Sequence, residues 1–316
     1  MDFEQLAKIE NESERVNRTY DIFNEDARLN HSKAARVEFL TTVHYIEKYL
    51  KDGDKILDIG AGAGEYSLYF ARKGYEVSAL ELADANIAAF KKKLTPEDKI
   101  DLVQGNALDL SRYADKSFDI VLLFGPLYHL KNDADKQKCI SEAKRVCKDG
   151  GKIFFSFISN DFVFLTEFGY DVNYFSNGDY DKETFKLNDF PFVFHTVGAA
   201  RKLLADGGIN ILHEVASDGA SELLAARINE MSDEDYTQYL RYHFYICEKP
   251  ELLGMTKSLA VHGRKEMTKI QYENSTIRQA EVADAKQLAA WWNDGAVMAH
   301  AGFPNGLGTT EEEVVK

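Results

Sequence analysis

Cysteine is scarce in this chain, and its spacing argues against two kinds of structure. Cys139, Cys147 and Cys247 are the three cysteines among 316 residues, and no C-x-x-C pair occurs. Three cysteines cannot all pair, which disfavours a disulfide framework, and their separation disfavours a zinc site. We therefore expect no resident metal and a reducing, cytoplasmic location.

Positive charge and long apolar runs are also lacking. Asp and Glu outnumber Lys and Arg by 52 to 38, which gives a formal charge of −14 and a pI near 5.1. This balance disfavours general binding to a phosphate backbone, so we expect no nucleic-acid partner. No apolar run approaches a membrane span, and residues 1–5 lack the regions of a signal peptide, so no membrane association is expected.

The stretch that organises the chain is residues 55–65, KILDIGAGAGE. Its apolar residues predict a short buried strand, and the glycines at 60, 62 and 64 predict a turn that lets the backbone pass close to a ligand. A helix is then expected from Glu65 to about Gly74. A strand, a glycine turn and a helix open a doubly wound α/β domain, whose ligand lies beyond the carboxyl ends of the strands.

Two acidic residues bear on which ligand binds there. The dinucleotide fingerprint requires Gly or Ala at its sixth position, next to the pyrophosphate, but this chain has Glu65. That anion argues against NAD. Asp58 adds a carboxylate at the strand end, which favours a ligand with a positive charge.

These residues resemble motif I of the class I S-adenosylmethionine (SAM) dependent methyltransferases, which matches Asp58-Ile-Gly-Ala-Gly-Ala-Gly64. The resemblance continues in order through residues 53–158. It implies a Rossmann-like, seven-stranded and mostly parallel sheet with helices on both faces. Strands are expected at 56–59, 75–81, 100–107, 118–124, 152–158, 210–216 and 259–263.

The resemblance also implies SAM as cofactor, S-adenosylhomocysteine (SAH) as product, and a set of cofactor-binding positions. Glu81, at the end of the second strand, is expected to bond the ribose hydroxyls, and Asn106 is expected beside the adenine. The full set is Tyr20, Asp58, Gly60, Ala61, Gly62, Gly64, Glu81, Leu82, Asn106, Ala107, Phe124 and Gly125.

The phrase Gly-Pro-Leu-Tyr-His-Leu at 125–130 resembles a subgroup of small-molecule methyltransferases. It makes Tyr128 and His129 the candidate catalytic residues, because they stand where the transferred methyl group would point. A general base is needed only for an acceptor that is protonated at the moment of attack. His129 is therefore either that base or a hydrogen-bonded structural histidine.

Segments outside the nucleotide core are expected to cover the site. Residues 1–52 are interpreted as a helical lid, with helices at 3–17 and 32–50. Tyr20, between these helices, touches the methionine end of the cofactor or simply docks the segment. Residues 159–196, rich in aromatics, Asn and Asp, are the candidate substrate cover.

Two further features complete this domain, which we place at 53–264. His195 is interpreted as the cap of the helix that follows it. Residues 221–247 carry two helical patterns, interpreted either as a lid or as a homodimer contact.

The last part of the chain differs in character. Residues 265–275 are a polar link, and 276–316 resemble the start of a GNAT acetyltransferase, with an amphipathic helix at 284–293 that carries Leu288, Trp291 and Trp292. The loop that binds the acetyl-CoA pyrophosphate in that family is missing. Acetyl transfer by this partial segment is therefore not expected.

We predict a SAM-dependent methyltransferase that acts by in-line displacement on O or N of a small or medium soluble acceptor. The chemistry consists mainly of holding donor and acceptor in line and excluding water. Two alternatives stay open: an NAD(P)-dependent oxidoreductase on the same fold, and a non-catalytic SAM-binding module. Glu81→Ala is expected to weaken cofactor binding without unfolding the protein.

Overall fold

The computed structural model describes residues 2–265, 269–272, 275–278, 282–299, 303, 305 and 307–314. The chain divides into two units, Met1–Glu266 and Met267–Lys316, and each is described separately. The division falls within the stretch expected to be a polar link.

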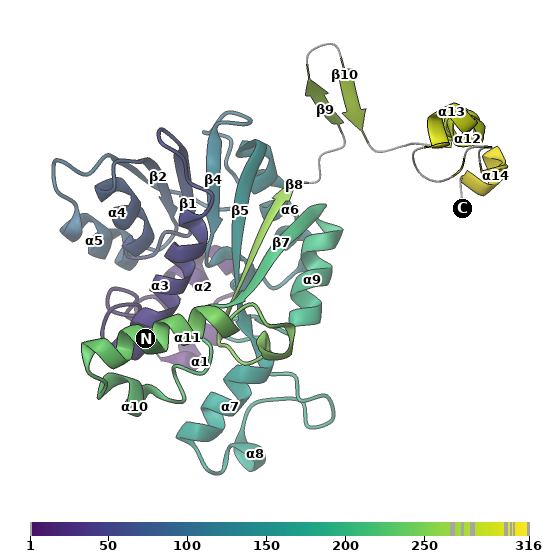
Figure 1. Ribbon diagram of the computed structural model, residues 1–316. Coiled ribbons are helices and arrows are strands. Elements are labelled where there is room, and N and C mark those ends of the chain that lie inside the picture. The colour runs from purple at the N-terminus through teal and green to yellow at the C-terminus, as the bar shows by residue number, and fades with distance from the viewer. Residues whose placement is uncertain are drawn as a thin grey trace. The chain divides into compact units, whose positions relative to one another are not determined.

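The first unit is built on one sheet in the order β3-β2-β1-β4-β5-β8-β7 (Figure 1). The short strand β6 lies outside this order and pairs with the end of β5. β8 is antiparallel to β5 and β7, and the other pairs are parallel. All seven expected strands are present, which confirms the mixed α/β prediction. The strands are β1 Lys55–Ile59, β2 Glu76–Glu81, β3 Ile100–Gln104, β4 Phe118–Leu123, β5 Cys147–Ser159, β6 Phe194–His195, β7 Ile209–Ala216 and β8 Ser258–Lys265.

Successive side chains of the central strands point to opposite faces of the sheet, where they pack into two hydrophobic cores. On one face Ile56 and Leu122 pack with α3 and α4, and on the other Leu57 and Leu123 pack with α6 and α9. Helices therefore cover both faces, as Figure 1 shows. The helices of the core are α3 Lys33–Glu47, α4 Glu65–Arg72, α5 Asp84–Lys93, α6 Asp133–Val146 and α9 Val197–Asp206.

Three local predictions differ from the structure. The single helix expected at 3–17 is two helices, α1 Phe3–Ala7 and α2 Glu12–Thr19, because Asn11 caps the second one through the Glu14 N–H. His195 is not the cap of α9: it lies in β6 opposite Ser159, and the cap is the neighbouring Thr196, whose hydroxyl accepts the Ala199 N–H. β5 begins at Cys147 rather than 152, across a register shift in its pairing with β4.

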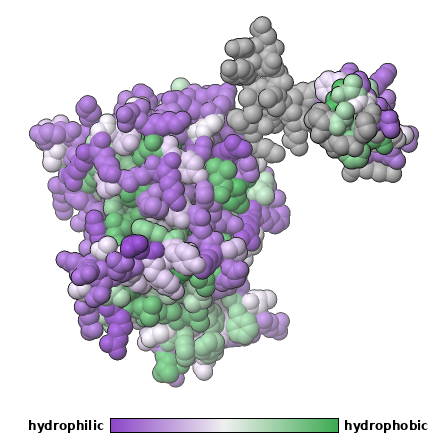
Figure 2. Space-filling model, viewed as in Figure 1, coloured by the Kyte–Doolittle hydropathy of each residue, from purple (hydrophilic) through white to green (hydrophobic). Residues whose placement is uncertain are grey.

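The segment after β5 forms α7 Asn160–Tyr170 and α8 Tyr174–Asn177 before it returns through β6. Its outer face is apolar, since Leu165, Phe168, Val172 and Phe175 are exposed there. Figure 2 shows this apolar surface over α7 and α8. A second helical segment, α10 Ala225–Asn229 and α11 Asp233–Ile246, packs on α3.

The second unit contains an antiparallel hairpin of β9 Lys269–Tyr272 and β10 Ser275–Arg278, and β9 lies where a polar link was expected. Helices α12 Ala285–Asn293, α13 Gly295–Met298 and α14 Glu311–Val314 follow. In α12 the buried side chains are Ala285 and Ala289, whereas Trp291 and Trp292 are exposed. Gln279 and Ala280, in the segment interpreted as resembling the start of a GNAT acetyltransferase, lie outside the described residues.

Candidate active site

The turn between β1 and α4 holds a buried carboxylate with an unused oxygen. Asp58 Oδ2 accepts a 2.7 Å hydrogen bond from Ser67 Oγ, while Oδ1 has no partner among the described residues. Burial raises the pKa of Asp58 to about 7, and the nearby Glu81 carboxylate acts in the same direction. A buried, unpaired carboxylate oxygen is costly by itself, which points to a donor or cation that completes it.

Gly60 and Gly64 of this turn each lie against a different part of the protein, where a side chain would not fit. A Cβ on Gly60 would lie 2.7 Å from the Phe124 carbonyl oxygen, so a side chain there would displace the backbone after β4. Gly64, at φ +85°, caps α4, and a Cβ there would lie 2.4 Å from the Phe90 ring. Gly60 and Gly62 line the cavities described below, whereas Gly64 packs the turn against α5.

Glu81 ties the end of β2 to the same turn. Its carboxylate accepts hydrogen bonds from the Gly62 N–H at 2.7 Å, the Ala83 N–H at 2.8 Å and the Asn86 amide at 3.3 Å. Burial nevertheless raises the pKa of Glu81 above its usual value. The bond to Gly62 occupies an N–H that a diphosphate at this turn would need.

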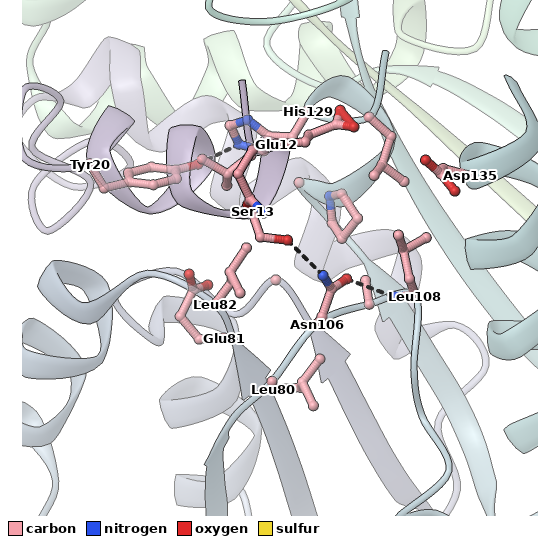
Figure 3. Close-up of a pocket in the computed structure, with 18 residues that line it drawn as sticks. Glu12, Ser13, Tyr20, Leu80, Glu81, Leu82, Asn106, Leu108, His129 and Asp135 are labelled. Carbon is pink, nitrogen blue, oxygen red and sulfur yellow. Dashed lines mark hydrogen bonds between the residues drawn. The ribbon is translucent and has the colours of Figure 1, made fainter. Parts of the chain in front are cut away.

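A first cavity of about 240 Å³ lies beyond the carboxyl ends of β1, β2, β3 and β4 (Figure 3). Most of the predicted cofactor positions line it: Tyr20, Gly60, Glu81, Leu82, Asn106, Ala107 and Gly125. The Asn106 amide donates to Ser13 Oγ at 3.0 Å, and its oxygen accepts the Leu108 N–H at 2.9 Å. The sequence therefore located this cavity through the ends of its strands.

Helix α2 lines the first cavity with Glu12, Ser13 and Val16, which the sequence analysis had not singled out. Ser13 bonds Asn106, and the Glu12 carboxylate accepts the Lys131 N–H at 2.9 Å. Tyr20, which follows α2, has its hydroxyl 2.9 Å from His129 Nε2. Each contact joins α2 or its end to a loop at the carboxyl edge of the sheet.

His129 lies inside this cavity and is buried. Burial lowers the pKa of His129 to about 3, so the ring is neutral at physiological pH. Its Nδ1 has no partner among the described residues, while Nε2 is engaged by Tyr20. Tyr128, its neighbour, points elsewhere and lines the next two cavities instead.

A small recess adjoins the first cavity at the glycine turn and is lined by Asp58, Ala61, Phe124, Tyr128 and Arg28, among others. Arg28 donates to Glu25 at 2.7 Å and to Glu38 at 2.8 Å, and these carboxylates hold the pKa of the guanidinium well above its usual value. The recess thus offers a carboxylate and a guanidinium. The sequence analysis did not single out Arg28, because no local pattern links it to Asp58.

A large cavity of about 710 Å³ lies under the insertion after β5. Aromatic and aliphatic side chains line much of it, and Arg28, Glu38, Ser156 and Ser258 line its polar part. Tyr20 lines the first cavity, the recess and the large cavity, and Tyr128 lines the recess and the large cavity. These two tyrosines therefore stand where the cavities meet.

Residues 57–155 match the family described as a methyltransferase domain. Over this stretch the chain is similar to a methyltransferase domain. The match covers β1 to β5, the strands whose ends form the first cavity and the recess.

Curated relatives share this methyltransferase domain. A demethylmenaquinone methyltransferase of Clavibacter sepedonicus is 34% identical over 121 residues, which is 38% of this chain and 47% of the relative. A ubiquinone/menaquinone biosynthesis C-methyltransferase of Haemophilus ducreyi is 32% identical over 146 residues, 40% of this chain and 54% of the relative. The matched stretch thus spans about half the length of these relatives.

Solved structures share the fold at low identity. The PH0226 protein of Pyrococcus horikoshii has a TM-score of 0.52 at 19% identity, covering 79% of this chain and 99% of its own. A magnesium protoporphyrin IX methyltransferase of Synechocystis with bound SAH has a TM-score of 0.51 at 13% identity, covering 81% and 100%. The [4+2]-cyclase SpnF reaches 0.52 at 18% identity, covering 81% and 96%, so this fold also serves other reactions.

The residues that line the recess and the first cavity fit SAM. The unpaired Asp58 oxygen lines the recess and suits the ammonium of an amino-acid end. Glu81 and Asn106 line the first cavity, where a nucleoside offers hydroxyls and ring nitrogens. When bound, SAM supplies an electrophilic methyl group on a sulfonium.

Proposed function

We propose that the chain transfers the methyl group of SAM to a small or medium acceptor held in the large cavity. One observation carries the proposal: the recess and first cavity, which suit SAM, meet the large cavity at Tyr20 and Tyr128. A donor site that opens into a separate, larger cavity is the arrangement that an in-line transfer requires. A binding module without an acceptor has no need of the second cavity.

The element that receives the methyl group is not narrowed to one. The sequence predicted oxygen or nitrogen, and the relative named as a ubiquinone/menaquinone biosynthesis C-methyltransferase adds carbon. The aromatic lining of the large cavity suits an acceptor with an apolar or ring-shaped body. We therefore propose an acceptor of this kind, methylated at carbon, oxygen or nitrogen.

Tyr20, Tyr128 and His129 are the proposed groups at the point of transfer. Tyr128 lines both the recess and the large cavity, so it is the candidate to position the acceptor. His129 has a lowered pKa, which makes it a weak base, and its Nε2 is bonded to the Tyr20 hydroxyl. This geometry supports a His129 role in holding Tyr20 over the cofactor more than a role as direct base.

Two measurements test the proposal. Calorimetry is expected to show binding of SAH and none of NADH, and absence of SAH binding by a folded sample would contradict the cofactor assignment. Incubation with methyl-labelled SAM and a metabolite panel that includes phenols, quinols and amines is expected to label at least one compound. SAH binding without any labelled product would favour the non-catalytic alternative.

A further inference from the structure

A small niche adjoins both the large cavity and the recess. Its hydroxyls include those of Ser156 of β5, Ser258 of β8 and Ser217 after β7, and Arg28, Glu38, Thr42, Tyr66, Phe124, Tyr128 and Ala260 complete its lining. The niche shares Ser156, Ser258 and Glu38 with the large cavity, Tyr66 and Phe124 with the recess, and Arg28 and Tyr128 with both. Because β5, β8 and β7 are neighbours in the sheet, three distant parts of the sequence deliver these hydroxyls to one place.

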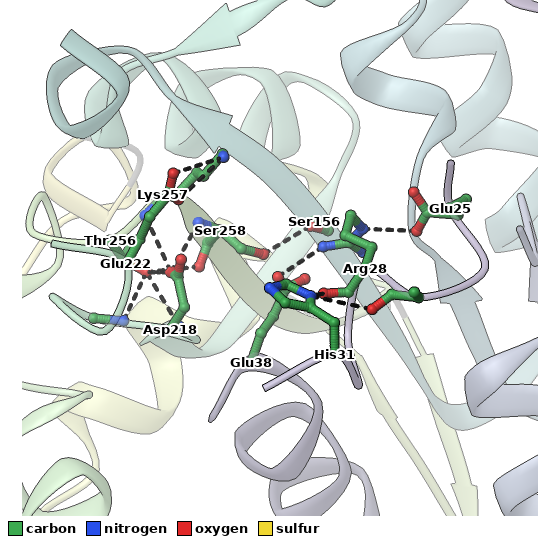
Figure 4. Close-up of polar contacts among 12 residues, drawn as sticks. Glu25, Arg28, His31, Glu38, Ser156, Asp218, Glu222, Thr256, Lys257 and Ser258 are labelled. Carbon is green, nitrogen blue, oxygen red and sulfur yellow. Dashed lines mark hydrogen bonds and ion pairs between the residues drawn. The ribbon is translucent and has the colours of Figure 1, made fainter. Parts of the chain in front are cut away.

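One hydroxyl of the niche is unused. Ser217 is fully buried, and its Oγ has no hydrogen-bond partner among the described residues. Ser156 Oγ and Ser258 Oγ lie 3.3 Å apart and, among the residues that the structure describes, bond only to one another (Figure 4). A buried hydroxyl without a partner is destabilising, which indicates that the niche is built for a group from outside the chain.

The niche has room for one small group. Its volume is about 20 Å³, slightly above the roughly 10–15 Å³ that one water molecule requires. A single hydroxyl fits, whereas a ring does not. The body of any molecule that uses the niche must therefore lie in the large cavity, where Val163, Leu187 and Phe194 provide apolar surface.

The charges around the niche are already paired. Arg28 is bonded to Glu25 and Glu38, and Lys257 forms a 3.0 Å ion pair with Glu222 (Figure 4). Asp218, behind Ser258, accepts hydrogen bonds from the backbone N–H groups of Lys257 and Ser258, each at 3.0 Å. A charged group entering the niche would lose water without gaining a free counter-charge.

We propose that the niche of Ser156, Ser217 and Ser258 binds one neutral hydroxyl group of the methyl acceptor. The proposal rests on the proposed function and narrows the acceptor to hydroxylated apolar molecules. A hydroxyl both donates and accepts, as the serines do, so it satisfies Ser217 Oγ and one of the paired serines together. Ser217 is thereby a specificity-determining residue whose hydroxyl serves the ligand and not the fold.

The test uses three matched probes with the full chain saturated with SAH. These are 4-ethylphenol, its methyl ether 4-ethylanisole and the anion 4-ethylbenzoate, each titrated by ligand-observed NMR. We expect 4-ethylphenol to bind tightest, and Ser217→Ala to weaken it about 5- to 10-fold, the effect of one lost hydrogen bond. Binding of the other two probes should not change.

Stability separates this role from a structural one. Ser217→Ala removes a hydroxyl that has no partner, so we expect the melting temperature of the unliganded chain to rise. Ser117→Ala, which removes a surface hydroxyl bonded to the Ala114 carbonyl, is the control and should leave probe binding unchanged. Ser156→Ala provides a second test of the niche if Ser217→Ala does not fold.

Three outcomes would overturn the proposal: equal binding of the phenol and its methyl ether, tightest binding of the anion, or unchanged phenol affinity in both niche variants. SAH calorimetry on the same samples keeps the two proposals apart. Intact SAH binding with any of these outcomes removes the niche assignment alone, whereas loss of SAH binding by the unmodified chain removes the proposed function.

Discussion

Two carboxylates at the carboxyl edge of the sheet are held in contrasting ways. Asp58 keeps one oxygen unpaired, whereas Glu81 accepts hydrogen bonds from two backbone N–H groups and one amide. Burial raises both pKa values, to about 7 for Asp58. Asp58 is therefore poised to change charge when a cation arrives, and Glu81 also shapes the turn.

The first prediction concerns the pH dependence of SAH binding. Below pH 7 Asp58 is mostly protonated in the free protein, and the SAH ammonium favours its carboxylate. Affinity should therefore rise between about pH 6 and pH 8, with proton release near pH 7. Calorimetry in two buffers of different ionisation enthalpy measures that release.

Asp58→Asn should remove both the proton release and the pH dependence, while Asp52→Asn, an exposed neighbour in sequence, should keep them.

The raised pKa of Asp58 also affects the stability of the unliganded protein. The folded chain binds this proton more tightly than the unfolded chain, so the stability of the unliganded protein should fall as pH rises towards and through 7. A proton release that persists in Asp58→Asn would assign it to another group.

The second prediction concerns Glu81. The sequence predicted that Glu81→Ala weakens cofactor binding without unfolding, but the structure adds a cost, because the substitution leaves the Gly62 and Ala83 N–H groups without their acceptor. We expect Glu81→Gln to weaken SAH binding about 10-fold or more, the value of a charged hydrogen bond, and to lower the melting temperature. Glu76→Gln is the control on the same strand.

Glu76 is exposed and forms a surface ion pair with Lys55, so its substitution should change neither measurement. SAH affinity in Glu81→Gln equal to that of the unmodified chain would show that the ribose is held elsewhere. A lower melting temperature with unchanged affinity would leave Glu81 a purely structural role.

At the scale of elements, the β1–α4 turn requires glycine at position 60 for two reasons: its positive φ and its close contact with the segment after β4. Gly60 and Gly53 have nearly the same φ, +78° and +83°, yet a Cβ on Gly60 would lie 2.8 Å from Pro126 Cδ and one on Gly53 would meet nothing within 4 Å. The pair therefore separates backbone strain from crowding.

The third prediction uses this pair. Gly53→Ala should cost about 1–2 kcal/mol from its left-handed backbone alone. Gly60→Ala should cost a further 1–3 kcal/mol or so from overpacking against the segment after β4, and should weaken SAH binding. Urea unfolding gives both values. Equal destabilisation of the two variants would mean that the segment after β4 moves to accommodate the new Cβ at position 60 at no cost in stability.

At the scale of the whole molecule, the cavities belong to one unit. Every residue that lines them lies between Asn11 and Ser258 or at Ala260, within Met1–Glu266. No described helix combines the length and apolar character needed to cross a membrane. The second unit supplies none of the residues that line the described cavities.

The fourth prediction follows from that division. A chain ending at residue 266 retains β8, the last strand of the sheet, and should bind SAH with the affinity of the full chain. Calorimetry and thermal melting of both chains check this. Loss of SAH binding in a shortened chain that still melts cooperatively would show that the second unit contributes to the site.

Sequence reasoning located the edge of the sheet where the first cavity lies, because two local rules act together. Periodicity identified the strands, and parallel strands bring their carboxyl ends to one edge, so Glu81 and Asn106 were expected near the glycine turn and lie there. It was wrong about His195, since two adjacent polar residues before a helix offer the same local signal for a cap.

The sequence by itself determined the positions of the strands along the chain, the glycine turn and the residues at the strand ends, because these depend on neighbours along the chain. Only the tertiary structure decided that Arg28 lines the same recess as Asp58, that the Tyr20 hydroxyl bonds His129 Nε2, and that three serines line one niche. These contacts arise from side-chain packing between segments far apart in the chain, for which no local pattern exists.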